Sequence, residues 1–395
     1  MDSALRVTAD EAKNYVLLTG ATGLVGQYLL RDLLSAGLKL AVLVRPKRKE
    51  TAEDRIERIL QKWEAESGES LPRPVILAGD VSEANFGFSD TQLDWVKHHC
   101  DRMIHNAAIL KFHASTRQEE PWQTNLSGTR HAIEIAEKAG IKELHYMSTA
   151  YVCGNRNSTI LESDFDDSHG FRNAYEHSKY EAEKLVRSAK QLDSVTIYRP
   201  VVISGDSQTG YTSTYHGLYV YLRLFSMFVP EQARDEHGKI LTPVKIPLDG
   251  DEPRNVVPVD WIANVFCEIF QNTAAHGRTY HLAPKTCLTP SVVIEACYEY
   301  FNSQGAEFCG SNIPSDHQHS DFAEKIFDNI AIYQQYESND PHFDTANLEQ
   351  FAGHLACPEI DSATIHRYLD FGNADEWGKK RPLKLVKPDV QERRA

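Results

Sequence analysis

Cysteine is scarce, and nothing in its placement indicates disulfides or a bound metal. The 395 residues include seven cysteines, an odd number, scattered singly with no CxxC pair. A secreted disulfide framework is therefore not expected, and a reducing environment is predicted. The sequence also lacks an HExxH motif and zinc-ribbon spacing, so it predicts no metal site.

Basic charge and long hydrophobic runs are lacking too. Lys and Arg number 42 against 56 Asp and Glu, a formal net charge of −14, so the basic field of a general nucleic-acid binder is absent. The longest apolar stretch, residues 218–229, is interrupted by Arg223 and is too short to span a bilayer. Residues 1–14 are polar and show no signal-peptide core. We therefore predict a cytoplasmic protein that binds no nucleic acid and has no transmembrane segment, and we leave its oligomeric state open.

The sequence does have an ordinary globular composition in which strand and helix patterns alternate. Hydrophobic residues make up 41% and charged residues 25%. Apolar runs typical of strands lie at 15–19, 40–44, 75–77, 101–105, 143–147 and 195–198. Helical patterns lie between them at 23–36, 52–66, 124–138 and 174–190. This alternation predicts βαβ units and an α/β fold with a Rossmann-type, doubly wound parallel sheet.

A glycine-rich turn, TGATGLVG at residues 19–26, joins the first expected strand to the first helix. Gly20 permits a tight turn, Gly23 lets the backbone approach a pyrophosphate, and Gly26 lets the helix pack against the strand. The N-terminus of the helix offers unpaired N–H groups to an anion. An incidental glycine-rich turn is the alternative, but the strand–turn–helix context disfavours it. The predicted contacts with a dinucleotide are Gly20, Thr22, Gly23, Leu24, Val25 and Gly26.

The end of the second expected strand indicates which dinucleotide is bound. Enzymes that bind NAD have an acidic residue there, whereas this chain has Arg45 followed by Lys47, Arg48 and Lys49. Arginine can hold a 2′-phosphate through two hydrogen bonds, so we predict NADPH, with Arg45 and Arg48 as contacts. A solvated basic loop is the alternative. The ends of the third and fourth strands supply the further expected contacts Asp80, Val81, Asn106, Ala107 and Ala108.

These patterns divide the chain. We assign residues 1–205 to an NADP(H)-binding Rossmann domain, completed by residues 256–283, where a helix is followed by a strand that can return to the sheet. Asp260 is expected to cap that helix. Residues 206–255 and 284–378 are assigned to a smaller C-terminal substrate-binding lobe. The last residues, 379–395, are rich in Lys, Arg and Pro and are expected to form a flexible tail.

A proton-transfer group is expected on the helix over residues 174–190. Tyr175 and Lys179 are four residues apart and share one helix face, so the lysine ammonium is expected to lower the pKa of the tyrosine. Thr149, at the end of the fifth strand, can hydrogen-bond a reacting oxygen. Asn125 can support Lys179 through a water molecule. The YxxxK spacing alone is common by chance, so it indicates a catalytic site only together with Thr149 and Asn125.

The motifs TGATGLVG, HNAA, Asn125, STAYVCG, YEHSK and RPVVISG occur in the order found in extended short-chain dehydrogenases/reductases. The sequence resembles that superfamily over residues 15 to about 283. The resemblance implies that Thr149 is the Ser/Thr of a catalytic triad, Tyr175 its proton donor and Lys179 the modulator of Tyr175. It also implies that Asn125, Tyr175, Lys179, Pro200 and Ile203 contact the cofactor. Cys153 departs from the family, which often has tyrosine there.

Residues 43–60, 73–87 and 199–210 further resemble the thioester reductases and fatty acyl-CoA reductases of the male-sterility-type branch. This resemblance implies NADPH-dependent reduction of an acyl thioester to an aldehyde, in some enzymes on to the alcohol. The donor would be acyl-CoA or an acyl-carrier protein, and the acidic net charge favours acyl-CoA. No adenylation or carrier segment is visible ahead of residue 14, so the thioester is expected to come from elsewhere. The aromatic segment 211–229 is either a core helix or the wall of an acyl channel.

Two other functions remain open from the sequence. One is a sugar-nucleotide epimerase or dehydratase, or a ketone or aldehyde reductase, of the same superfamily. The other is a dinucleotide-sensing regulatory protein without catalysis, which the intact Thr149, Tyr175 and Lys179 disfavour. The segment from Asp316 to His319 has metal-binding side chains, but a solvated loop is the expected interpretation.

Overall fold

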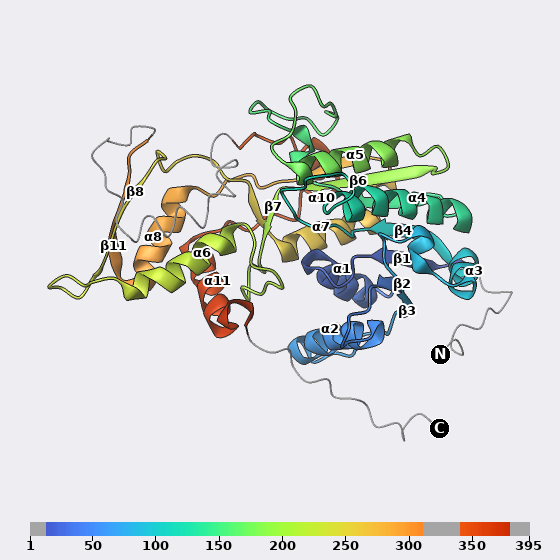
Figure 1. The fold of residues 1–395 in the computed structure, drawn as a ribbon, viewed down its shortest axis with the longest axis horizontal. Helices are drawn as coiled ribbons and strands as arrows, with labels where there is room; N and C mark the ends of the chain where they lie inside the picture. Colours follow the sequence, from blue (N-terminus) through green and yellow to red (C-terminus); the bar gives the residue numbers. More distant parts are fainter. Residues whose placement is uncertain (1–12, 311–339, 380–395) are drawn as a thin grey trace, which may run out of the picture.

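The computed structural model describes residues 13–310 and 340–379, and its centre is a seven-stranded parallel sheet (Figure 1). The strands are β1 (Tyr15–Thr19), β2 (Lys39–Val44), β3 (Val75–Ala78), β4 (Cys100–His105), β5 (Glu143–Met147), β6 (Ser194–Pro200) and β10 (Thr279–Leu282). They lie in the order β10-β6-β5-β4-β1-β2-β3. Chain order therefore reverses between β1 and β4, as in a doubly wound Rossmann sheet, which confirms the predicted fold class.

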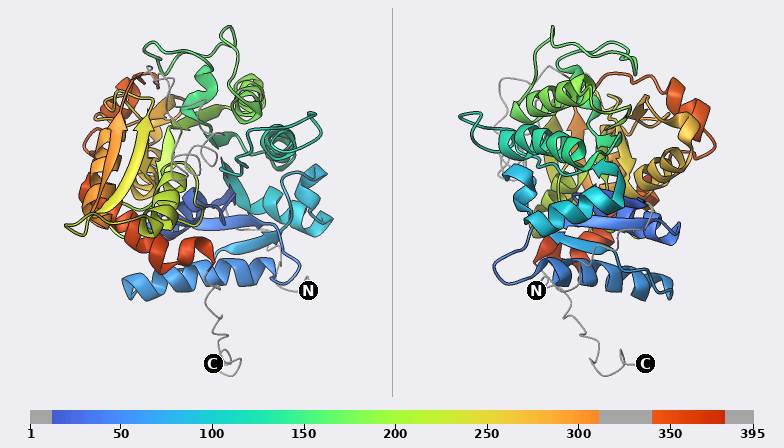
Figure 2. Two further views of the ribbon diagram at one scale, coloured as in Figure 1. Left: turned by 60° about the vertical axis from the view of Figure 1, so that its left-hand side comes forward. Right: turned by 90° about the vertical axis from the view of Figure 1, so that its right-hand side faces the viewer.

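The strands β1 and β2 are almost wholly apolar because both faces of the sheet are covered. Val16 and Leu18 face one hydrophobic core while Leu17, between them, faces the other, and all three are fully buried. The first core is covered by α1 (Leu24–Ser35), α2 (Ala52–Ser67) and α7 (Val259–Gln271). The second is covered by α3 (Asp90–His99), α4 (Gly128–Ala139) and α5 (Ala174–Ser188). Figure 2 shows the helices on either side of the sheet.

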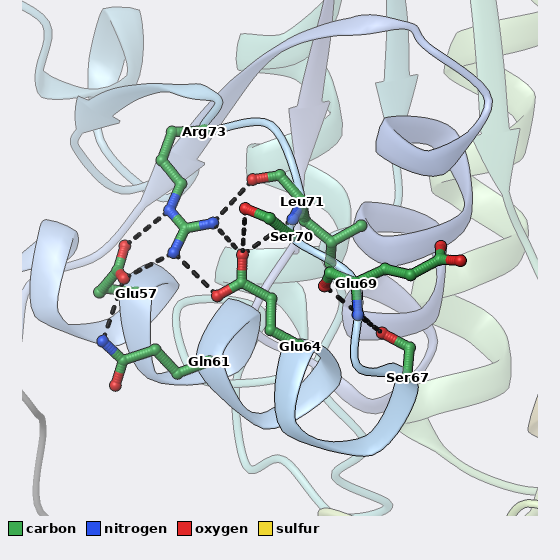
Figure 3. A network of polar contacts seen from close by, with 8 residues as sticks. All are labelled: Glu57, Gln61, Glu64, Ser67, Glu69, Ser70, Leu71 and Arg73. Atoms are coloured by element: carbon green, nitrogen blue, oxygen red, sulfur yellow. Dashed lines mark hydrogen bonds and ion pairs between the residues drawn. The ribbon is translucent and has the colours of Figure 1, made fainter.

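An arginine fixes the connection from α2 to β3 (Figure 3). The Arg73 guanidinium pairs with Glu57 at 2.8 Å and also with Glu64, about two turns further along α2. It donates in addition to the Leu71 carbonyl at 2.7 Å. The same turn begins with an αL residue, Gly68, which ends the helix. The strand β3 is thereby held next to β2 at the edge of the sheet.

The remaining elements lie mostly beyond one side of the sheet (Figure 1). They include α6 (Leu218–Phe228), β8 (Ile240–Ile246), α8 (Pro290–Phe301), β11 (Ser303–Phe308) and α11 (Ser362–Ala374). β8 pairs with β11, and the short strands β7 (Val202–Ser204) and β9 (Val256–Pro258) form a second parallel pair. The helix α10 (Ala346–Ala352) packs against α7 and β10. The domain boundaries expected from the sequence stay a prediction.

Some local expectations need correction. Asp260 does not cap α7, because the helix begins at Val259 after Pro258, and the Asp260 carboxylate accepts hydrogen bonds from the backbone N–H and hydroxyl of Ser207. The helix expected over 124–138 is a π-helical turn at Gln123–Ser127 followed by α4. The strand expected at 278–282 is confirmed as β10, beside β6.

The Asp316–His319 segment and most of the expected tail, residues 380–395, lie outside the described residues. None of the helices within 13–310 and 340–379 is long and apolar enough to cross a membrane.

Candidate active site

The glycine turn leaves the start of α1 open. Gly20 has a φ of +74°, and a Cβ there would lie 2.7 Å from the Ala107 backbone nitrogen. A Cβ on Gly26 would collide with the Gly20 carbonyl, so this glycine is needed for packing. Gly23 precedes the helix without a side-chain cap, so the first N–H groups of α1 remain available to an anion. The turn has the geometry that a dinucleotide pyrophosphate requires.

A cavity of about 780 Å³ runs from this turn to the elements beyond the sheet, a size typical of small-molecule sites. It lies at the carboxyl ends of the strands, where chain order reverses. Of the residues predicted from the sequence, it is lined by Gly20, Thr22, Gly23, Leu24, Val25, Arg45, Asp80, Val81, Asn106, Ala107, Ala108, Thr149, Tyr175, Lys179, Pro200 and Ile203.

Three predicted residues do not line the cavity. Gly26 packs beneath the turn, as its position in the motif implies. Arg48 is exposed in the loop after β2. Asn125 is buried, and its amide bonds the backbone N–H and carbonyl of Ile109 and the Ser178 hydroxyl, 2.9 to 3.2 Å away. Asn125 thus joins the segment after β4 to α5, and its predicted contact with the cofactor stays a prediction.

The cationic end of the cavity contains an arginine that the sequence analysis did not assign. Arg55, on α2, donates to the Thr22 hydroxyl at 2.9 Å and to the Arg45 carbonyl. Arg45 itself forms an ion pair with Asp80 at 3.2 Å, and its side chain is 65% exposed. Arg55 is therefore the guanidinium attached directly to the glycine turn. The sequence shows a second arginine ten residues after Arg45. It does not show that this side chain points toward the glycine turn.

Thr149, Tyr175 and Lys179 meet at the cavity wall. Tyr175 and Lys179 lie on one face of α5, which begins at an Asn173 cap, and Thr149 follows β5. The Lys179 ammonium is buried and donates to the Met147 carbonyl at 2.6 Å. The Thr149 side chain lies near enough to the Tyr175 hydroxyl to act on its pKa. The two hydroxyls therefore adjoin one another, as required to bind a single oxygen.

The pKa values at this site differ from the simple expectation. Burial raises the pKa of Tyr175 to about 12, and the Thr149 side chain offsets only part of that shift. The expected lowering of this pKa by Lys179 is therefore wrong, because burial is the largest influence on Tyr175. Burial lowers the pKa of Lys179 to about 7 despite the Glu183 carboxylate nearby. Tyr175 is thus a protonated phenol at neutral pH, suited to donating a proton.

A buried ion pair supports this group from behind. The Glu183 carboxylate, one turn after Lys179, accepts hydrogen bonds from the Ser148 hydroxyl at 2.6 Å and from Arg199 at 2.7 Å. Burial alone would raise the pKa of Glu183, but the Arg199 guanidinium lowers it overall, so the carboxylate stays charged. This pair fixes α5 against the ends of β5 and β6. Neither Glu183 nor Arg199 was predicted from the sequence as part of the site.

The other end of the cavity is largely apolar. Its wall is formed by side chains of α6, β8, α8 and the adjoining loops: Leu218, Tyr221, Phe225, Val244, Ile246, Leu248, Val256, Leu288, Val293 and Ile294. In the aromatic segment 211–229, Phe225 and Phe228 both pack against a hydrophobic cluster of α6 and β8, and of the two only Phe225 also lines the cavity. The core interpretation therefore holds for part of this helix, and the acyl-channel interpretation stays a prediction.

Taken together, the sheet's reversal point, the open glycine turn and the two adjoining hydroxyls face one cavity. An arrangement of this kind defines the class of NAD(P)-binding short-chain dehydrogenases/reductases. Within that class the chain belongs to the male sterility protein family, whose family model matches residues 18–266.

Individual proteins are more distantly similar. Aldehyde reductase lnaA of Aspergillus flavus is 26% identical over 396 residues, which cover 91% of this chain and 36% of that protein, so the chain spans about a third of its length. The terminal R domain of the myxalamid PKS-NRPS pathway has a TM-score of 0.73 at 24% identity, covering 94% of this chain and 93% of that domain. A thiolation-reductase di-domain from an archaeal non-ribosomal peptide synthetase has a TM-score of 0.67 at 17% identity, covering 93% and 91%. At these identities the two structures show a shared fold.

Proposed function

We propose that the protein reduces an acyl thioester to an aldehyde with NADPH. The observation that carries this proposal is the single cavity that joins the glycine turn and the Thr149–Tyr175 hydroxyls to an apolar wall. The size and lining of that wall suit an acyl group. Family membership and the likeness to reductase domains support the same reaction.

The residues present can perform this chemistry. NADPH, when bound along the glycine turn, would supply the hydride. The Thr149 and Tyr175 hydroxyls are placed to donate hydrogen bonds to the carbonyl oxygen of the substrate, where negative charge develops. Their donation would stabilise the oxyanion that forms when hydride adds to the thioester carbonyl, and collapse of that oxyanion re-forms the carbonyl as an aldehyde and expels the thiolate. For a subsequent reduction to the alcohol, Tyr175 is the group that can give a proton to the oxygen.

The comparisons favour a carrier protein as the donor of the acyl group. A similar structure is a thiolation-reductase di-domain, in which a carrier accompanies the reductase. The acidic net charge instead favours acyl-CoA. We propose the carrier-bound thioester as the substrate, with acyl-CoA as a poorer analogue that presents the same pantetheine thioester.

The proposal is tested by NADPH consumption with matched substrates. One acyl group is presented as carrier thioester, CoA thioester and free aldehyde. We expect aldehyde product from both thioesters, with the higher kcat/KM for the carrier. Turnover of the free aldehyde alone would make the protein an aldehyde reductase, the second candidate, which the Aspergillus relative favours. Turnover of nucleotide sugars alone would overturn both.

The rate should depend on the charge of Lys179. Because burial lowers the pKa of Lys179 to about 7, the ammonium is lost as the pH rises through that value. We therefore expect kcat/KM, which reports the free enzyme, to fall above about pH 7. The matched variant Lys179→Arg keeps its charge at every accessible pH. It should be slower but lack this alkaline limb. A wild-type profile that is flat from about pH 6 to 9 would contradict this role of the ammonium.

Two phenylalanines of α6 allow the acyl-binding role of this helix to be distinguished from its packing role. Each buried methylene contributes about 0.8 kcal/mol, so kcat/KM should rise about fourfold per added carbon until the cavity is full. Phe225→Ala should move the optimum to longer or bulkier acyl groups because Phe225 lines the cavity. The control Phe228→Ala should lower the free energy of unfolding, by at most about 3–5 kcal/mol, without moving the optimum. An optimum that moves equally in both variants would show that α6 does not line the acyl site.

A further inference from the structure

Three side chains with metal-binding atoms converge at the sheet edge opposite the cavity. Glu143 begins β5 and His145 follows two residues later on the same face, while His276 precedes β10. Met147, at the other end of β5, lines the cavity, whereas none of the three converging residues does. The cluster is therefore outside the site described above.

The distances are those of a compact site. Glu143 Oε1 lies 2.8 Å from His145 Nε2 and 3.1 Å from His276 Nδ1, and the potential ligand atoms all lie within 4.8 Å of one another. The His145 side chain is fully buried and that of His276 is 7% exposed, whereas that of Glu143 is 25% exposed. An ion could enter on the carboxylate side, where water could complete its coordination.

In each imidazole, the ring nitrogen that faces away from Glu143 has a hydrogen-bond partner. His276 Nε2 lies 3.1 Å from the carbonyl oxygens of Ile269 and Phe270, which only accept hydrogen bonds, so this nitrogen carries a proton. His145 Nδ1 lies 2.9 Å from the Tyr198 hydroxyl, whose oxygen can accept a hydrogen bond from a proton on that nitrogen. Metal-bound histidines usually donate their other N–H in this way, which leaves the inner nitrogen free for the ion.

We propose that Glu143, His145 and His276 form a zinc-binding site that stabilises the fold. The ligand set, two imidazoles and a carboxylate, is one that Zn²⁺ accepts, with a water molecule as the fourth ligand. The ion would tie the turn after α7 to the first residue of β5, two segments more than 130 residues apart in the chain. Without metal, the same atoms form a carboxylate–imidazole network, and the bond to Glu143 raises the pKa of His276.

One nearby charge opposes the ion. Arg102, on β4, pairs with Glu143 in the sheet register, and its guanidinium lies 5.1 Å from the Phe270 ring, which packs on His145. Removing this positive charge should therefore strengthen zinc binding. Arg102→Gln thus gives a variant that is expected to change affinity in the opposite direction from removal of a ligand.

The experiment uses the full chain, stripped with a chelator and then titrated with Zn²⁺ alone. We expect about one zinc per chain after gel filtration, and a melting temperature that rises with zinc. His276→Gln and Glu143→Gln should abolish both effects, and circular dichroism without metal shows whether each variant is folded. Tyr198→Phe, which keeps all three ligands, should weaken binding about 10–100-fold. The control His354→Gln alters an exposed histidine 3.9 Å from Glu268 and should bind zinc as the wild type does.

The results separate the site from the bare polar network. Wild-type protein that retains no zinc overturns the proposal, since the cluster is then only an ion-paired network. Retention of zinc at unchanged affinity by folded His276→Gln and Glu143→Gln overturns it too, because the ion would be bound elsewhere. Because the cluster is remote from the cavity, zinc occupancy should leave turnover unchanged, so this result is independent of the proposed function.

Discussion

Replacement of Tyr175 by phenylalanine should lower kcat by about 10²–10⁴-fold, the usual contribution of a positioned proton donor. The phenol is protonated at neutral pH because burial raises its pKa to about 12, and its hydroxyl adjoins that of Thr149. The variant removes this hydroxyl and leaves Lys179 with its bond to the Met147 carbonyl. The dissociation constant of NADPH, measured by fluorescence titration, should therefore change little.

A matched control is available in the same cavity. Tyr151 also lines it, but its hydroxyl donates to the Asp340 carboxylate at 3.2 Å. Tyr151→Phe removes the same atom from the same residue type, so it should retain most of the wild-type kcat. Comparable losses in the two variants, or a Tyr175→Phe enzyme with near wild-type turnover, would remove Tyr175 from the role of proton donor.

Arg55→Ala should weaken NADPH binding by about ten- to a hundredfold and NADH binding much less. Loss of a charge-assisted hydrogen bond costs about 1.5–3 kcal/mol, which corresponds to this change in affinity. Arg55 is held against Thr22 of the glycine turn, so its guanidinium is preorganised for the phosphate that distinguishes the two cofactors. Calorimetric titration of both cofactors into the wild type and the variant measures the difference.

Two neighbouring arginines provide the comparison. Arg45 shares its guanidinium with Asp80, so a phosphate must compete with that carboxylate, and Arg45→Ala should cost less than Arg55→Ala. Arg48 is exposed outside the cavity, and Arg48→Ala should leave both affinities unchanged. Equal weakening of NADPH and NADH by Arg55→Ala would mean that Arg55 supports the turn without reading the phosphate.

The sheet and the glycine turn were predictable because their signals are local. In β1 and β2 consecutive apolar residues, such as Val16, Leu17 and Leu18, indicate a strand that is buried on both faces. The placement of Tyr175 and Lys179 on one helix face followed from the helical repeat alone. That Thr149 adjoins them required the resemblance to a known family, since β5 and α5 are separated by a long loop.

The parts that the sequence did not reveal depend on packing between distant segments. Asp260 has the residue type of a helix cap, but a hydroxyl and an N–H at Ser207 compete for its carboxylate and win. Arg55 lies on the helix after β2, and only the packing of α2 directs it to Thr22. The lowering of the Tyr175 pKa failed as an expectation because burial of the phenol, which depends on packing between distant segments, raises that pKa.

The site combines residues from a single helix with residues from several separate elements. Tyr175, Lys179 and Glu183 project from a single helix at four-residue intervals, and any insertion within that helix would rotate them apart. The apolar wall, in contrast, is assembled from α6, β8 and α8, and a change in one of its side chains leaves the reacting group where it is. Selection can therefore alter which substrates are accepted without rebuilding the chemistry, so this architecture is open to diversification of substrates while the reaction itself is conserved.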